Sequence, residues 1–76
     1  SMKLKTLDLH GHYHDAVDRI VSNFVFLNDL PVKIIIGNSS RMQELVKQTL
    51  DYHGFEYHNE RWINHGCLIV DKKTDL

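Results

Sequence analysis

The run from Val32 to Ile36 restricts the fold of this chain more than any other segment, because every residue in it except Lys33 is β-branched. Such a run is typical of a strand that is covered on both faces or lies at the centre of a sheet. The segments on either side carry apolar residues at helical spacing. The sequence therefore predicts a central strand between two helical crossovers.

The first helix is predicted from Asp15 to Leu27, where the apolar residues follow the 3.6-residue period of a helix that packs by one face. Asn28 to Pro31 should end it, since proline disfavours the α conformation in the residue before it. Three cap-forming residues introduce the second helix, and Gly54 is well placed to end it. The buried stripe of that helix is predicted to be Met42, Leu45, Val46 and Leu50.

Three further strands complete the pattern. Lys3 to Leu9 alternates imperfectly as a first strand, and Phe55 to His58 alternates as a third. Asn59 to Asn64 is predicted to form a turn, Gly66 to Val70 an antiparallel last strand, and Lys72 to Leu76 a frayed tail. The fold class is therefore α/β, as an α+β two-layer sandwich of order βαβαββ, with a mixed four-stranded sheet and both helices on one face.

The composition is that of a small globular domain. At 76 residues, with 42% hydrophobic and 25% charged residues, the chain has room for one core, so we predict one domain over residues 1–76. Ser1 before Met2 is typical of a residue left by expression. No apolar run approaches a membrane span, and no secretory signal is seen. The single cysteine, Cys67, predicts a reducing, cytoplasmic location, and its apolar surroundings predict a small buried hydrophobe.

The run Leu7-Asp8-Leu9-His10-Gly11 carries the first candidate site. Asp8 and His10 stand at i and i+2 of a predicted strand and would share a face at its carboxyl end. A carboxylate and an imidazole there could hold a metal and serve as general acid or base in phosphodiester cleavage. The alternative is structural: Asp8 accepts backbone N–H bonds and His10 braces the loop.

A second glycine turn follows the central strand. Backbone N–H groups at Gly37, Asn38, Ser39 and Ser40, at the start of a helix, would attract phosphate, and Arg41 could add a forked donor. An ordinary capped helix would explain the same residues without any ligand. If both strands run parallel, the two turns share one edge of the sheet.

The chain resembles the small MutS-related (Smr) domain family. The family's first strand ends in Leu-Asp-x-His-Gly, matched here by Leu7 to Gly11, and its second ends in a Thr-Gly-x-Gly turn, matched by Ile36 to Ser39. Ile36 replaces the threonine and Ser39 the second glycine. A late Gly-x-x-x-Val strand corresponds to Gly66 to Val70. The resemblance covers nearly the whole chain and implies the two-layer sandwich, nuclease activity tied to Asp8 and His10, and nucleic-acid binding by the glycine turn.

Histidines and basic residues suggest further contacts. His10, His12 and His14 alternate at a spacing that zinc accepts, although they straddle a loop; His12, with Gly11 and Tyr13, could instead contact substrate. The net charge of −1 argues against a strongly electrostatic nucleic-acid binder. Trp62 could stack on an unpaired base or pack over the core. A local basic patch would be formed by Lys33, Arg41, Lys47 and Arg61.

Together these observations predict a domain that binds DNA or RNA by structure rather than by sequence. Asp8 and His10 are the predicted catalytic and metal-binding residues of a divalent-metal-dependent endonuclease that uses Mg²⁺ or Mn²⁺. Gly11, His12 and the turn from Gly37 to Arg41 are predicted to contact the nucleic acid. The alternative is a non-catalytic module that uses the same edge to bind nucleic acid or a protein.

Overall fold

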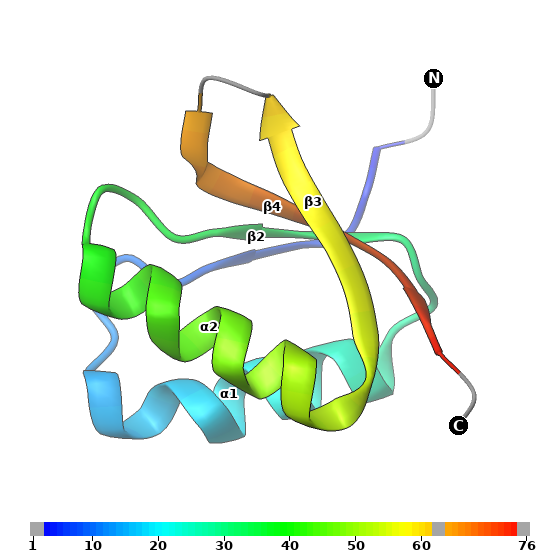
Figure 1. The fold of residues 1–76 in the computed structure, drawn as a ribbon, viewed down its shortest axis with the longest axis horizontal. Coiled ribbons are helices and arrows are strands. Elements are labelled where there is room, and N and C mark those ends of the chain that lie inside the picture. The colour runs from blue at the N-terminus through cyan, green and yellow to red at the C-terminus, as the bar shows by residue number, and fades with distance from the viewer. Residues whose placement is uncertain (1–2, 62–63, 75–76) are drawn as a thin grey trace.

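The structure is a computed structural model that describes residues 3–61 and 64–74. Two helices and four strands make up the fold, together with a short 3₁₀ helix (Figure 1). In chain order the elements are β1 (Thr6–Asp8), η1 (His14–Ala16), α1 (Val17–Leu27), β2 (Val32–Ile35), α2 (Ser40–His53), β3 (Phe55–Arg61) and β4 (Asn64–Lys73).

The strands form one mixed sheet in the order β1-β2-β4-β3. β1 and β2 are parallel, whereas β4 is antiparallel to both of its neighbours. The predicted βαβαββ order and the mixed four-stranded sheet are confirmed, and β2 lies inside the sheet as its β-branched sequence indicates. Both helices lie on the same side of β1 and β2 (Figure 1).

The core fills the space between the helices and the sheet. Val17, Val21 and Val25 are spaced four residues apart and face inward from α1. The opposite sheet face is not covered by a helix: Lys33 and Ile35 on β2 remain half-buried. Of the two alternatives predicted for this run, a strand covered on both faces does not hold for β2, and a strand inside the sheet is confirmed. The other buried apolar residues are Leu9, Val32, Ile34, Ile36, Met42, Val46, Leu50, Phe55, Leu68 and Val70.

The ends of the helices follow their capping residues. The Ser39 side chain accepts the backbone N–H of Met42 at 3.1 Å and begins α2, and Gly54, in the left-handed conformation at φ 79°, ends it. α1 ends at Leu27, before Pro31, as predicted. Neither helix in the described part of the chain is both long enough and apolar enough to cross a bilayer.

The strand boundaries differ from those predicted. β1 covers only Thr6–Asp8 of the expected Lys3–Leu9, while β3 and β4 are longer than expected. The prediction of a turn from Asn59 to Asn64 is wrong at both ends, because cross-strand pairing continues to Arg61 and Asn64. The backbone N–H and C=O groups of this polar segment pair across the hairpin, so the strands continue here without apolar side chains.

The predicted frayed tail is also shorter. Lys72 and Lys73 belong to β4, and the Thr74 N–H donates to the Gly54 carbonyl at 2.7 Å. The Thr74 hydroxyl donates to Glu56 Oε2 at 2.9 Å. Cys67 is free and half-buried rather than buried, because it alternates with the core residue Leu68 and lies on the face that no helix covers.

Candidate functional site

The parallel pairing of β1 with β2 brings two loops to one edge of the sheet. Asp8 is in register with Ile35, and the Leu9 N–H donates to the Ile35 carbonyl at 2.9 Å. The loops that leave the two strands therefore begin side by side, as Figure 1 shows at the left of the molecule. We call their candidate residues, Asp8–His12 and Gly37–Arg41, the loop edge.

The Asp8 carboxylate has a structural partner within its own loop. Its Oδ1 accepts the backbone N–H of His10 at 2.9 Å. Exposed and buried side chains alternate through this segment, with Asp8 and His10 exposed and Leu9 buried between them. Both predicted catalytic residues thus reach solvent, although β1 itself ends at Asp8. One carboxylate oxygen organises the turn, and the second can contact a ligand.

Gly11 permits the sharp turn that follows. Its φ of 83° lies in the left-handed region, which glycine enters without a steric penalty. The His12 N–H donates to the Leu9 carbonyl at 3.1 Å and closes this turn. His10, Gly11 and His12 are all exposed, so the first loop presents two imidazoles next to the Asp8 carboxylate.

The second loop is tied to the sheet at its glycine. Gly37 has φ 87°, and its N–H donates to the Gly66 carbonyl at 3.1 Å. The Gly37 carbonyl accepts from the Gln43 side chain at 3.2 Å. Since the Gly37 N–H already has a partner, a phosphate at this turn would be bound by the N–H groups that follow Gly37 in the chain.

Those later N–H groups belong to the start of α2. Ser40 and Arg41 precede the first intrahelical hydrogen bond, which the Gln43 N–H makes to the Ser39 carbonyl at 3.0 Å. The Ser39 hydroxyl is used as the helix cap. Asn38, Ser40 and Arg41 are exposed. The arrangement leaves these three polar side chains exposed, next to helical N–H groups that have no partner within the helix.

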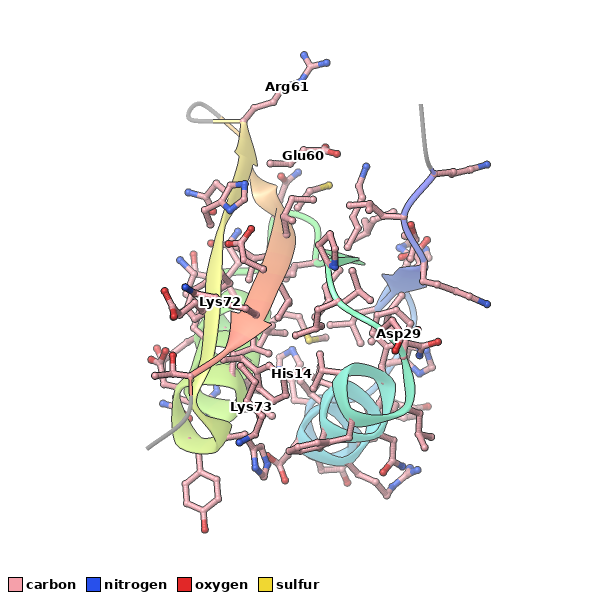
Figure 2. All side chains as sticks on the ribbon, turned by 90° about the vertical axis from the view of Figure 1, so that its right-hand side faces the viewer. His14, Asp29, Glu60, Arg61, Lys72 and Lys73 are labelled. Carbon is pink, nitrogen blue, oxygen red and sulfur yellow. The ribbon has the colours of Figure 1, made fainter. Side chains whose placement is uncertain are left out.

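Two of the four basic residues predicted to form a patch have acidic partners, and the charge of Arg61 acts on Lys33. Arg41 pairs with Glu44 at 2.7 Å, and Lys33 pairs with Glu60 at 2.6 Å. The hydrogen bond that the Lys33 ammonium donates to Glu60 raises the pKa of Lys33 above its ordinary value. Arg61 projects from the far end of the β3–β4 hairpin, away from the helices (Figure 2). Trp62 lies outside the described residues.

The metal prediction rests on Asp8 and His10. Among residues 3–61 and 64–74, no three side chains of His, Cys, Asp or Glu converge as a ligand group. A hard divalent ion such as Mg²⁺ is often held by one or two carboxylates and several waters, which the free oxygen of Asp8 fits. The His10 imidazole suits Mn²⁺ or a later transition metal better than Mg²⁺.

A pocket next to the loop edge includes His12 and Tyr13, which the sequence indicated as candidate substrate contacts. It has a volume of about 690 Å³ and is lined by His12, Tyr13, His14 and Asp15. The sequence assigned Asp15 only to the start of a helix. Tyr13 is the sequence signal for this pocket. A large aromatic residue between a glycine turn and a helix has no position in the core and is therefore a candidate for ligand contact.

No family model matches the sequence, and neither the curated proteins nor the solved structures contain a match to this chain.

Proposed function

We propose that the loop edge binds nucleic acid and that Asp8 and His10 hydrolyse a phosphodiester bond there with the help of a divalent metal. The observation that supports the proposal is the parallel register of β1 and β2, which brings the segment Asp8–His12, exposed except for Leu9, to the same sheet edge as the loop that leads to α2. The carboxyl ends of parallel strands are where α/β sheets commonly bind ligands. The resemblance to Smr domains at Leu7 to Gly11 supports the same residues.

The two side chains have complementary roles in this proposal. The free oxygen of Asp8 would orient the attacking water, and a neutral His10 would accept its proton as the water oxygen bonds to phosphorus. The protonated imidazole would then donate to the oxygen that leaves as the P–O bond breaks. A bound divalent metal would supply charge neutralisation at the phosphate and lower the pKa of a water. Ser40 and Arg41 would hold the neighbouring phosphate.

A non-catalytic module is the second candidate, and one specific observation favours it. Asp8 Oδ1 already accepts the His10 N–H at 2.9 Å, so the pair has a structural role that needs no reaction. In that case the same exposed edge would bind nucleic acid, or a protein segment, without turnover.

The deciding experiment incubates the purified chain with labelled single-stranded, double-stranded and branched DNA and RNA, in Mg²⁺, Mn²⁺ or chelator. Asp8→Ala and His10→Ala are the test variants, and Asp29→Ala is the matched control. Asp29 is exposed and lies in the loop before β2, at the opposite end of that strand from the loop edge (Figure 2).

Metal-dependent cleavage that is lost in both test variants and kept in the control would support the nuclease. Retarded migration without cleavage would support the module. If neither retardation nor cleavage occurs at low salt, nucleic-acid binding is wrong for this chain.

A further inference from the structure

The pocket formed by residues 12–15 differs in character from the phosphate-directed part of the loop edge. Tyr13 is 81% exposed, comparable with Tyr52 at 85%, so its ring is free to contact a ligand. Two imidazoles and one carboxylate complete the lining. The volume is about 690 Å³, and the pocket is a shallow hollow that is largely open to solvent, which suits a ligand that is covered on one face.

The backbone beneath Tyr13 is held in place on both sides. The His12 N–H donates to the Leu9 carbonyl at 3.1 Å, and the Tyr13 carbonyl accepts the Ala16 N–H at 3.1 Å. Tyr13 itself has an extended backbone, with φ −78° and ψ 148°. An aromatic ring on an anchored backbone loses little conformational entropy when it contacts a ligand. The ring is therefore a suitable stacking platform.

The electrostatics of the pocket favour a base over a phosphate. The Asp15 carboxylate in the lining repels an anion. A carboxylate does, however, accept hydrogen bonds from the amino groups on base edges. A flat, uncharged ring with amino donors fits these groups better than a phosphate does.

The charges on the rest of the surface also favour an unpaired base over a duplex. Binding to duplex DNA depends mainly on lysine and arginine contacts with phosphates. Here Lys33 and Arg41 each have an acidic partner, at 2.6 and 2.7 Å, and the net charge is −1. Phosphate contacts such as that proposed for Arg41 are then few, and stacking on an unpaired base can supply affinity that does not depend on charge.

We infer that the pocket of His12, Tyr13, His14 and Asp15 receives one unpaired base, stacked on Tyr13, so that the substrate is single-stranded or locally unpaired nucleic acid. This inference rests on the proposed function, because the base is placed next to a phosphate at the loop edge. It adds a substrate class: fully paired duplex cannot present such a base without unstacking it, which costs binding energy.

The test measures binding by fluorescence anisotropy in chelator, so that no strand is cut. The probes are one labelled strand, its fully paired duplex, the duplex with a single bulged base, and single strands with one base removed at each position in turn. The proteins are the unmodified chain, Tyr13→Ala, Tyr13→Phe and the control Tyr52→Ala. Tyr52 is 85% exposed, on the last turn of α2, and does not line this pocket.

We expect the single strand and the bulged duplex to bind about tenfold more tightly than the paired duplex. Removal of one particular base should weaken binding by about tenfold in the unmodified chain and in Tyr13→Phe, but by less than about twofold in Tyr13→Ala. Tyr52→Ala should behave as the unmodified chain.

Two results would overturn the inference while leaving the proposed function standing: equal binding of paired and unpaired probes, or a base-removal penalty that persists in Tyr13→Ala. Absence of binding to every probe would overturn both. Because Tyr13 is exposed, its variants should keep the thermal unfolding midpoint of the unmodified chain, which distinguishes a lost contact from a lost fold.

Discussion

Asp8 Oδ1 accepts the backbone N–H of His10 at 2.9 Å, so the carboxylate to which we assign catalysis also shapes the loop that carries its partner. The two roles can be separated because asparagine retains an oxygen acceptor and lacks the negative charge. A change at Asp8 can therefore be designed to remove the charge and keep the turn.

We expect Asp8→Asn to abolish cleavage while its free energy of unfolding stays within about 0.5 kcal/mol of the unmodified chain, and Asp8→Ala to lose about 1 kcal/mol in addition to cleavage. Urea unfolding and the cleavage assay measure the two effects independently. Cleavage that survives in Asp8→Asn would contradict a role for the charge.

Arg41 is restrained by its pair with Glu44, at 2.7 Å on the exposed first turn of α2. Glu44→Gln should free the guanidinium for phosphate and raise nucleic-acid affinity about threefold at low salt, with a steeper dependence on salt concentration. The stability change should be less than about 0.5 kcal/mol, as for other exposed pairs. Binding titrations at several salt concentrations measure both quantities.

Glu56→Gln is the matched control for this change. It removes the same charge from an exposed residue of β3 that lies 3.8 Å from Lys72, on an element that does not contribute to the loop edge. An equal gain in affinity from Glu56→Gln would show that overall charge, rather than Arg41, is responsible.

The helices are joined by a hydrogen bond from the hydroxyl of Thr49 to Asp18 Oδ1 at 2.9 Å. Thr49 is 4% exposed, and it lies among apolar core residues of α2. Thr49→Val keeps the shape and removes the donor, so we expect a loss of about 1–2 kcal/mol in unfolding free energy. Thr49→Ser should lose less from this bond because it retains the hydroxyl. If Thr49→Val is as stable as the unmodified chain in urea unfolding, the hydrogen bond between Thr49 and Asp18 contributes nothing to stability.

Tyr57 should make the fold sensitive to alkali. Burial, followed by the hydrogen bond from its hydroxyl to Asp51 at 2.9 Å, raises the pKa of Tyr57 from 10.0 to about 12. The folded state therefore holds this proton more tightly than the unfolded state does. Its contribution to stability is complete below pH 10 and is lost as the pH rises from 10 to about 12.

With allowance for solvent screening of a partly exposed group, the loss amounts to about 1 kcal/mol. Tyr57→Phe should be less stable at pH 8 and should lack this component of the alkaline decline. The measurement compares urea unfolding of the two proteins at each pH. If the unfolding free energies of the two proteins fall in parallel from pH 8 to 12, Tyr57 is not the source of the alkaline decline.

Several elements could be predicted because their signals are local. The capping residue Ser39 and the terminating residue Gly54 set the limits of α2 through hydrogen bonds and a left-handed φ within a few residues. Hydrophobic periodicity identified the buried face of α1 for the same reason. Of the loop-edge residues, Asp8, His10 and Gly37 were identified from short motifs that need no knowledge of distant contacts.

The predictions that failed depended on partners far away in the chain. β3 and β4 extend through polar residues because cross-strand backbone bonds, not side-chain burial, hold them together. Cys67 has apolar neighbours in sequence and yet is half-buried, since strand parity assigns it to the uncovered face. The pairing of Lys33 with Glu60 joins β2 to β3, which no spacing rule relates.

The sequence by itself determined the order of the elements, the ends of both helices, the cap of α2 and the two glycine turns, because each is decided by the conformational preferences and hydrogen-bonding groups of adjacent residues. α1 begins at Val17 rather than at the predicted Asp15, because His14–Ala16 form a 3₁₀ helix. The tertiary structure confirmed that the turns share an edge, and it alone decided that the Gly37 N–H is taken by the Gly66 carbonyl and that Tyr13 is exposed beside a pocket. These features arise from strand register and packing between segments distant in the chain, and such contacts leave no mark in local sequence.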